Sequence, residues 1–351
     1  MQRFGLTLLA SALLATTIAH AETDYPTRPI TVLVPHAAGG PTDTVARLIA
    51  ESMTGTLGQQ LVVENAGGAG STVGTARAAR AEPDGYTVLL NHVAQASSAT
   101  LYRKLPYDPV KDFAGIGRIT DVPMTIVARA DFPAGSIAEL IEYIKANKEG
   151  VTYAHAGVGS ASHLCGMLFM DAIDTPMTTV PYKGTGPAMT DLLGGQVDVM
   201  CDQTTNTANQ IKSGKIKGYA VTTKERLPVL PDLPTLDESG LAGFEMTVWH
   251  GLFAPAGTPK DAVDKLSQAL QKAVQDPKVA HTVAFAEGTF NPVAQMGNPD
   301  CFSLFTKEEL DAIQYDSLEE EMARSVEYDI VPDYDKLLDI MTAAKREASG
   351  G

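Results

Sequence analysis

The sequence predicts an α/β fold of two lobes, each with a central, mostly parallel sheet flanked by helices, joined by a two-crossover hinge. Three observations lead to this prediction. Short apolar runs alternate with helical patterns from Pro29 to about Phe290, as in βαβ units. The chain has 351 residues, more than a single hydrophobic core usually serves. A strand, turn and helix unit that begins at Val151 echoes the unit that begins at Ile30.

The first 21 residues have the features of a secretory signal peptide. Arg3 precedes an apolar run over residues 8–15, and Ala19-His20-Ala21 is a small-x-small cleavage pattern. We therefore expect residues 1–21 to be removed and the mature chain to begin near Glu22. No later stretch reaches the roughly 20 apolar residues that a membrane span requires, so a soluble, exported protein is expected.

Strands and helices follow one another in lobe 1. Residues 30–34 predict a buried strand, which a glycine-rich turn connects to an amphipathic helix and then to a strand over 61–63. The apolar face of that helix is formed by Val45, Leu48, Ile49 and Met53. Pro83-Asp84-Gly85 predicts a turn before a strand over 86–90.

The second half repeats this alternation. A strand over 125–128 and a helix spaced by Ile137, Leu140, Ile141 and Ile144 precede the strand over 151–154. Further strands are predicted over 178–180, 197–200, 218–221 and 252–254, followed by a helix over about 260–274.

The chain is expected to cross between the lobes near 121–126 and again near 246–252, which places a hinge under a central cleft. Lobe 1 then comprises residues 22–124 and 250–306, and lobe 2 comprises residues 125–249. The Glu-rich segment 307–351 predicts surface helices packed on lobe 1.

Composition excludes some functions. The chain has 27 Lys and Arg against 42 Asp and Glu and no basic block, so the footprint of a nucleic-acid binder is missing. An acidic protein still binds anions where backbone N–H groups and helix N-termini supply local positive potential. The three cysteines Cys165, Cys201 and Cys301 have no metal-binding spacing. Cys165 and Cys201 either form one bridge or stay free, and the sequence leaves both open.

Two loops have the chemistry to hold an anion. The first, residues 35–43, contains Gly39 and Gly40, which allow close backbone approach, and Pro41, which suits the first position of a helix. The second, residues 156–163, contains Ser160 as an N-cap residue. Both loops follow strand ends, where open parallel sheets bind ligands. The alternative for each loop is a tight turn that holds no ligand.

Several side chains near these loops have two interpretations. Asp43 would repel a carboxylate, so we interpret it chiefly as a brace for the first loop, with a water-mediated ligand contact as the alternative. His36 and His163 are either structural histidines or ligand contacts. The polar stretch 91–98 and the strand end at Asp202 either form the far wall of the site or are solvated. Lys183 either attracts anions or lies in solvent.

At these residues the chain resembles the solute receptors of tripartite tricarboxylate transporters, over residues from about 26 to 290. The resemblance rests on seven motifs in order: Val34-Pro35 with Gly39-Gly40-Pro41-Thr42-Asp43, Glu64-Asn65 with Gly67-Gly68-Ala69-Gly70, Pro83-Asp84-Gly85-Tyr86-Thr87, Lys104-Leu105-Pro106-Tyr107-Asp108-Pro109, Gly159-Ser160 with His163-Leu164, Val180-Pro181-Tyr182-Lys183-Gly184, and Asp232-Leu233-Pro234-Thr235.

The resemblance implies a periplasmic-binding-protein fold and a receptor that binds a small di- or tricarboxylate between its lobes. It also implies delivery to integral-membrane transporter subunits, a location in the periplasm, no catalysis, no cofactor and no metal. We further expect a monomer. The expected ligand-binding residues are His36, Ala38, Gly39, Gly40, Thr42, Asp43, Gln95, Ser98, Gly159, Ser160, Ala161, His163 and Asp202.

Three departures from the family pattern affect these expectations. His36 stands where the family usually has an aromatic residue, and Ser98-Ala99 stands where an Asn-Pro pair is common. Beyond about Lys307 the chain follows the family poorly. The sequence does not identify the carboxylate.

Two other functions remain as alternatives. A sensory receptor that presents the carboxylate to a membrane kinase would share the fold and the pocket. An exported hydrolase would use Ser160 with His163, but no GxSxG elbow and no acid to orient the histidine accompany this pair.

Overall fold

The computed structural model describes residues 25–147 and 150–279. The predicted signal peptide, residues 280–306 of lobe 1 and the segment 307–351 lie outside the described residues, so those expectations remain predictions. The division into lobes 22–124 with 250–306 and 125–249 also remains a proposal, and we keep the names lobe 1 and lobe 2 for these ranges.

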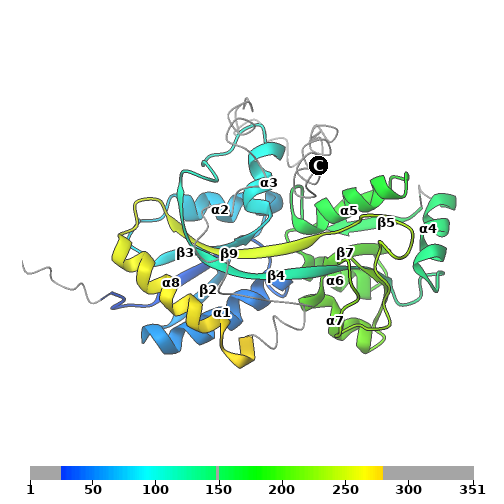
Figure 1. Cartoon of the computed structure of the whole chain (residues 1–351). Helices are drawn as coiled ribbons and strands as arrows, with labels where there is room; N and C mark the ends of the chain where they lie inside the picture. The colour runs from blue at the N-terminus through cyan, green and yellow to red at the C-terminus, as the bar shows by residue number, and fades with distance from the viewer. Residues whose placement is uncertain (1–24, 148–149, 280–351) are drawn as a thin grey trace, which may run out of the picture.

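Lobe 1 is built around three parallel strands. β1 (Ile30–Val34) pairs with both β2 (Leu61–Asn65) and β3 (Thr87–His92). The helices of this lobe are α1 (Pro41–Leu57), the short 3-10 helix η1 (Ala69–Ser71), α2 (Thr72–Ala79), α3 (Ala94–Leu101) and α8 (Lys260–Val274). α1 and α8 pack together on one face of the sheet, and α2 lies on the opposite face (Figure 1).

Lobe 2 repeats this arrangement. β5 (Thr152–His155) pairs in parallel with β6 (Thr178–Pro181) and with β7 (Val199–Gln203). A further strand, β8 (Ile216–Val221), belongs to this lobe. Its helices are α4 (Ile137–Ala146), α5 (Ala161–Ala172), α6 (Thr185–Leu193) and α7 (Thr204–Lys212).

Two long antiparallel strands connect the lobes. β4 (Phe113–Arg129) and β9 (Thr247–Pro255) lie side by side and run from one lobe into the other (Figure 1). The sheet order is β2-β1-β3-β9-β4-β7-β5-β6, with β8 also paired to β4. Both predicted crossovers therefore fall within strands, and the predicted α/β class with helix-flanked sheets and two crossovers is confirmed.

Each lobe has its own hydrophobic core. In lobe 1, Val32 and Val34 of β1 pack with Val45, Ile49 and Met53 of α1, the face that the helical spacing predicts. Burying each of these side chains stabilises the fold by roughly 1.5–3 kcal/mol. α1 ends at Gly58, whose φ of 68° provides the left-handed cap that glycine adopts most easily.

The core of lobe 2 surrounds β5 and β7. Tyr153, Phe169 and Ile126 are fully buried in it. Cys165 of α5 and Cys201 of β7 form a disulfide in this core, which joins a helix to the strand beneath it. Of the two alternatives left by the sequence, the structure contains the bridge.

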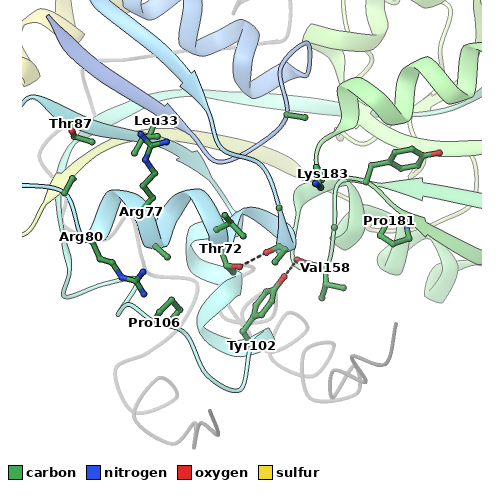
Figure 2. A pocket seen from close by; sticks show the side chains of 18 of the residues that line it. Leu33, Thr72, Arg77, Arg80, Thr87, Tyr102, Pro106, Val158, Pro181 and Lys183 are labelled. Carbon is green, nitrogen blue, oxygen red and sulfur yellow. Dashed lines mark hydrogen bonds between the residues drawn. The ribbon is translucent and has the colours of Figure 1, made fainter. Parts of the chain in front are cut away.

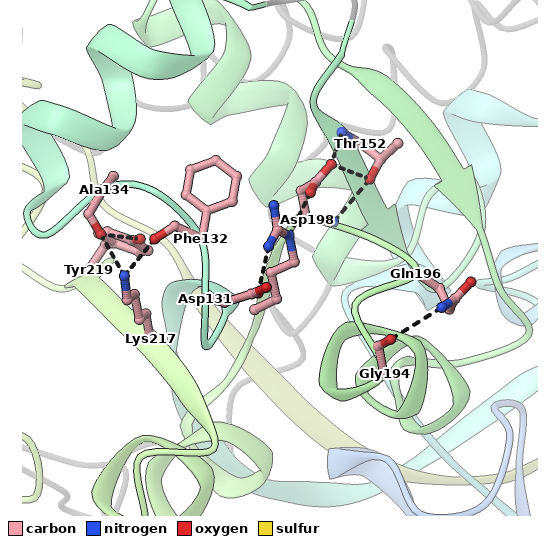
Figure 3. A network of polar contacts seen from close by, with 10 residues as sticks. Asp131, Phe132, Ala134, Thr152, Gly194, Gln196, Asp198, Lys217 and Tyr219 are labelled. Atoms are coloured by element: carbon pink, nitrogen blue, oxygen red, sulfur yellow. Dashed lines mark hydrogen bonds and ion pairs between the residues drawn. The ribbon is translucent and has the colours of Figure 1, made fainter.

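A polar network holds the end of lobe 2 that lies away from lobe 1 (Figure 3). Arg129, the last residue of β4, donates from Nε to Asp198 at 2.9 Å and also contacts Asp131. The second oxygen of Asp198 accepts hydrogen bonds from both the backbone and the hydroxyl of Thr152, each at 2.9 Å. The starts of β5 and β7 are thereby fixed against the end of β4.

Candidate anion-binding site

The first glycine-rich loop connects β1 to α1 and ends at Gly40, the N-cap residue of that helix. Pro41 occupies the first helical position, where no backbone N–H is needed. Among the described residues, the backbone N–H groups of Thr42 and Asp43 find no acceptor. Because the first N–H groups of a helix have no partner within it, these two are open to an acceptor in front of α1.

Asp43 braces the first loop. Its Oδ2 accepts hydrogen bonds from the backbone N–H of Gly39 and from Arg47 Nε, both at 3.0 Å. Burial acts to raise the pKa of Asp43, but the hydrogen bonds from Arg47 and Gly39 outweigh it and hold the pKa below its usual value. Asp43 is therefore ionised, and its charge is matched by Arg47.

The second loop connects β5 to α5. Ser160 is the N-cap residue, as predicted: its Oγ accepts from the backbone N–H of His163 at 3.3 Å and donates to the carbonyl of Gly157 at 2.6 Å. In the described part of the chain, the backbone N–H groups of Ala161 and Ser162 have no acceptor. The first turn of α5 thus offers open donors like those of α1.

Two further helices begin at the same place. α6 begins at Thr185, and α7 begins at Thr204 after its N-cap residue Gln203. Thr185 and Gln203 line the same cavity as Thr42 and Ala161. Since each helix N-terminus carries roughly half a positive charge, four of them favour an anion between the lobes.

The cavity at these four helix starts is enclosed by both lobes and has a volume of about 20 Å³. Its lining consists of His36, Gly40, Pro41, Thr42 and His92 from lobe 1, and Ala156, Ser160, Ala161, Ser162, Thr185, Asp202 and Gln203 from lobe 2. No Lys or Arg is among these lining residues of the described structure. Helix N-termini, rather than lining cationic side chains, therefore supply positive potential at the site.

Two side-chain atoms in the cavity wall lack a partner. His36 Nε2 and Gln203 Oε1 are buried and make no hydrogen bond within the described residues. Leaving such atoms unsatisfied costs free energy, so a buried polar atom without a partner indicates a place where a ligand or water binds.

Five of the seven histidines gather at the junction of the lobes. His36 stacks on His92 with ring centroids 4.5 Å apart, and His92 meets His250 edge-on at 5.6 Å. In lobe 2, His155 and His163 are 4.8 Å apart. These rings are largely buried, which determines their charge.

Burial is the main cause that lowers the pKa of all five histidines. It brings the pKa of His36 and of His155 to about 4, and that of His250 to about 3. The pKa of His163 falls to about 3 and that of His92 falls well below its usual value, with neighbouring histidines contributing. All five rings are therefore neutral at neutral pH and add no cation to the site.

Asp202, near the end of β7, is the one acidic residue in the lining of the described cavity. Its side chain is 1% exposed, and its Oδ2 accepts a hydrogen bond from Asn206 Nδ2 at 2.6 Å. Burial raises the pKa of Asp202 to about 6, against the lowering effect of hydrogen bonds that include the one from Asn206. The surroundings of Asp43 thus lower its pKa, whereas those of Asp202 raise its pKa.

The lobes contact each other through hydrogen bonds around the cavity. The backbone N–H of Ala37 donates to the carbonyl of Lys183 at 2.9 Å, and Ser97 Oγ donates to the carbonyl of Gly159 at 2.7 Å. Tyr102 Oη donates to the carbonyl of Val158 at 3.0 Å. Each bond joins lobe 1 to lobe 2.

Glycines allow the two lobes to approach closely. A Cβ at Gly186 of α6 would lie 2.6 Å from the carbonyl oxygen of Ala38, and a Cβ at Gly70 would lie 1.7 Å from that of Val158. Real Cβ atoms essentially never come so close to another atom. The closed arrangement of the lobes therefore requires glycine at both positions.

Six of the expected ligand-binding residues line the cavity: His36, Gly40, Thr42, Ser160, Ala161 and Asp202. Ala38, Gly39, Asp43 and Gly159 lie in the two loops beside it. Gln95 and Ser98 lie behind the cavity in α3, where Gln95 bonds Asn91 and the carbonyl of Pro109, and Ser98 bonds the carbonyl of Gln95. His163 accepts the backbone N–H of Gly159 at Nδ1.

Thr185 was not predicted from the sequence to belong to the site. The available signal was the strand over 178–180 followed by Gly184, the same strand, turn and helix pattern as in the two loops. For Gln203, which follows a predicted strand together with Asp202, the sequence left open whether it faces the cleft or is a satisfied polar residue at a strand end. His92 had been considered only as part of a polar stretch.

A second, larger hollow lies beside the site. It is a groove of about 1460 Å³ with Arg77 of α2 and Arg80, which follows α2, on one side and Pro181 and Lys183 of lobe 2 on the other (Figure 2). The hydrogen bond from Tyr102 to Val158 crosses it. None of the buried, unpartnered polar atoms of the described residues belongs to its lining. The enclosed cavity is therefore the better candidate for the ligand site.

The described residues show neither a metal-binding cluster nor a membrane-spanning helix. Within them, no group of three or more His, Cys, Asp or Glu side chains is placed to hold a metal ion. Within them too, every helix is too short or too polar to cross a membrane.

Residues 45–311 match the tripartite tricarboxylate transporter family receptor. A UPF0065 protein encoded in the TAR-I ttuE-ttuC' intergenic region of Agrobacterium vitis is 51% identical to this chain over 312 residues, which is 89% of each protein.

Solved structures are similar over most of the chain. The periplasmic binding protein BugD is 56% identical with a TM-score of 0.73, covering 75% of this chain and 88% of its own. MatC (Rpa3494) from Rhodopseudomonas palustris with bound malate is 40% identical with a TM-score of 0.76, covering 83% and 99%. R. palustris Rpa4515 with adipate is 29% identical with a TM-score of 0.69, covering 92% and 98%.

Proposed function

The chain belongs to the tripartite tricarboxylate transporter family of receptors, and we propose that it is an extracytoplasmic receptor that binds a small di- or tricarboxylate between its lobes and delivers it to a tripartite membrane transporter. The observation that carries this proposal is the convergence of four helix N-termini on one enclosed cavity without a cationic side chain. Charge-assisted hydrogen bonds from open N–H groups stabilise a carboxylate there.

Related receptors support the class of ligand. MatC holds malate and Rpa4515 holds adipate, and both are small dicarboxylates. In this chain, one carboxylate of such a ligand would bind the N–H groups of Thr42, Asp43, Ala161 and Ser162. Those donors come from both lobes, so the ligand stabilises the arrangement in which the lobes are together.

The family consists of solute-binding receptors rather than enzymes, which opposes the hydrolase alternative. In this chain the Ser160 hydroxyl donates a hydrogen bond to the carbonyl of Gly157 and accepts one from the backbone N–H of His163. Both its proton and a lone pair are therefore used in hydrogen bonds within the loop and the start of α5. Ser160 is better explained as a structural cap beside the ligand.

Export, transport and the monomeric state complete the proposal. Residues 1–21 act as a signal peptide, and the mature receptor acts in the periplasm as a monomer. The cavity is small, so the lobes must separate to admit a ligand and to release it to the membrane subunits.

Calorimetric titration of the purified receptor tests this function. The panel contains succinate, malate, adipate and citrate, with glucose and lysine as ligands of other charge. We expect at least one di- or tricarboxylate to bind with a 1:1 stoichiometry, and neither control to bind. A folded receptor that gives no heat with any carboxylate would reject the ligand class. Loss of uptake of the bound carboxylate in a deletion strain tests delivery separately.

A further inference from the structure

Asp202 is a buried acid in the wall of a cavity that is built for an anion. On the basis of the proposed function, we propose that carboxylate binding takes up one proton, which Asp202 carries and donates to the ligand in a hydrogen bond. Asp202 then determines both the strength of binding and its pH dependence. Its role goes beyond that of a polar residue at a strand end.

The charge of the cavity favours a protonated Asp202 when a carboxylate is bound. A ligand carboxylate and an ionised Asp202 would share an enclosed space of about 20 Å³. The lining residues of the described cavity include no Lys or Arg that would offset a second negative charge. Two carboxylates that share one site raise the pKa of one of them strongly, so that one of the two holds a proton.

The surroundings of Asp202 also favour its protonated form. The groups that donate hydrogen bonds to its carboxylate are neutral: Thr185 of α6, Asn206 of α7 and the backbone of Gln203. Thr125 of β4 donates to its backbone carbonyl. The titratable side chain nearest on β5 is Tyr153, which is neutral and donates to the carbonyl of Ser162. Even before a ligand binds, burial outweighs the hydrogen bonds to the carboxylate and raises the pKa of Asp202 to about 6.

Two histidines across the cavity are the other possible proton carriers. His36 and His92 line the wall that faces Asp202, and His36 Nε2 has no partner among the described residues. Burial holds the pKa of His36 at about 4, below that of Asp202. Asp202 therefore accepts a proton more readily than His36. His155 and His163, on β5 and α5, line the neighbouring groove instead.

The binding step is balanced by one proton from solvent. Because residues of lobe 1 form part of the cavity wall, we expect separation of the lobes to expose Asp202 to water and leave it ionised. Binding combines the ligand carboxylate, Asp202 and one proton into a carboxylic acid that donates its O–H to the ligand carboxylate. Because the bound state holds one proton more than the free state, the dissociation constant rises with pH by up to about tenfold per unit.

Calorimetry in two buffers of different ionisation enthalpy measures this proton directly. The experiment uses malate, or adipate if malate does not bind, above about pH 6.5, where free carboxylic acids are ionised. We expect an uptake close to one proton per ligand. A carboxylate that binds with no net proton uptake would overturn the inference while leaving the receptor function intact. No heat with any carboxylate would instead remove the function on which the inference rests.

The substitution Asp202→Asn tests whether Asp202 is the group that takes up the proton. Asparagine keeps the shape and, like a protonated acid, donates a hydrogen bond, so this variant should bind without proton uptake. Its dissociation constant should be nearly independent of pH and lower than that of the original protein at pH 8. Asp171→Asn, at an exposed position of α5 in lobe 2, is the matched control and should keep the original pH dependence.

A third variant separates Asp202 from the histidines. His36→Gln should leave proton uptake unchanged. If uptake disappears in His36→Gln and persists in Asp202→Asn, the histidine carries the proton and the assignment to Asp202 is wrong.

Discussion

At the scale of single residues, the histidines at the junction of the lobes link folding to pH. The folded protein holds His36, His92, His155, His163 and His250 neutral by burial, whereas the unfolded chain protonates them near pH 6.5. A lowered pKa in the folded state means that stability is complete above about pH 6.5 and is lost as the pH falls toward about 4. Asp202 has a raised pKa and acts in the opposite direction.

We therefore expect the free energy of unfolding to fall by at least about 2 kcal/mol between pH 7 and pH 5. Urea denaturation at several pH values measures this fall. His155→Asn is the test variant, because Asn retains an acceptor for the Gly157 N–H that His155 Nδ1 now binds at 3.1 Å. The pH dependence should become weaker in this variant. An unchanged profile would mean that His155 is not among the groups responsible.

Gly186 provides a residue-scale test of lobe closure. In Gly186→Ala the new Cβ meets backbone atoms of Ala38, Gly39 and Gly40 in lobe 1, yet it lies within a helix of lobe 2, where alanine is favourable. We expect carboxylate affinity to fall at least about tenfold, equivalent to about 1.4 kcal/mol, with no loss of stability.

The matched control is Gly55→Ala in α1, where a Cβ meets nothing within 4 Å. It should raise stability by roughly 0.5–1 kcal/mol and leave affinity unchanged. Normal affinity in Gly186→Ala would show that the ligand does not need the lobes to come as close as they do here.

At the scale of elements, the strand, turn and helix units were predictable from the sequence. The apolar spacing of α1 and the turn chemistry around Gly40 and Ser160 placed both loops correctly at helix starts. Helix spacing and turn conformation are determined mainly by residues close together along the chain. Both can therefore be recognised from the sequence.

Helix α3 was not predictable in this way. Residues 91–98 were interpreted as a polar stretch after a strand, but residues 94–101 form a helix that is buried on almost every side. A helix without a solvent face has no amphipathic spacing to detect. β4 was predicted only over 125–128, because Gly115, Gly117 and Pro123 break the strand pattern. In the structure, pairing with β9 carries the strand through these residues, with register shifts beside the glycines.

The disulfide between α5 and β7 gives a prediction at this scale. It closes a loop of 36 residues, and the loss of chain entropy predicts about 4 kcal/mol of stabilisation. Urea denaturation with and without a reducing agent should show a decrease of this order. The same comparison in Cys165→Ala with Cys201→Ala is the control and should show no effect of the reductant. Equal stability of the reduced and oxidised protein would mean that the bridge adds nothing.

At the scale of the whole molecule, the complete site depends on the order of strands in the sheet. That order brings the starts of α6 and α7 beside those of α1 and α5. The sequence shows that each helix follows a strand, but it does not show which strand ends are neighbours. For this reason both loops were found and Thr185 was not.

The shared sheet also predicts how the molecule unfolds. Since β4 and β9 contribute to both cores, the two lobes should unfold in one transition. Fluorescence of Trp249, the single tryptophan, and far-ultraviolet circular dichroism should give the same urea midpoint. Bound carboxylate at 100 times its dissociation constant should add about 2.7 kcal/mol. Two separate midpoints would show that the lobes are independent.

The position of β9 in the sheet determines the order in which the molecule can be assembled. β4 reaches the strands of lobe 1 only through β9, although β9 is made more than a hundred residues later. During synthesis, β3 has an unpaired edge until Pro255 has emerged, so lobe 1 remains incomplete for most of translation. Contacts between such distant segments form slowly. In a growing chain of this topology, we therefore expect the sheet of lobe 1 to close only after β9 has been synthesised.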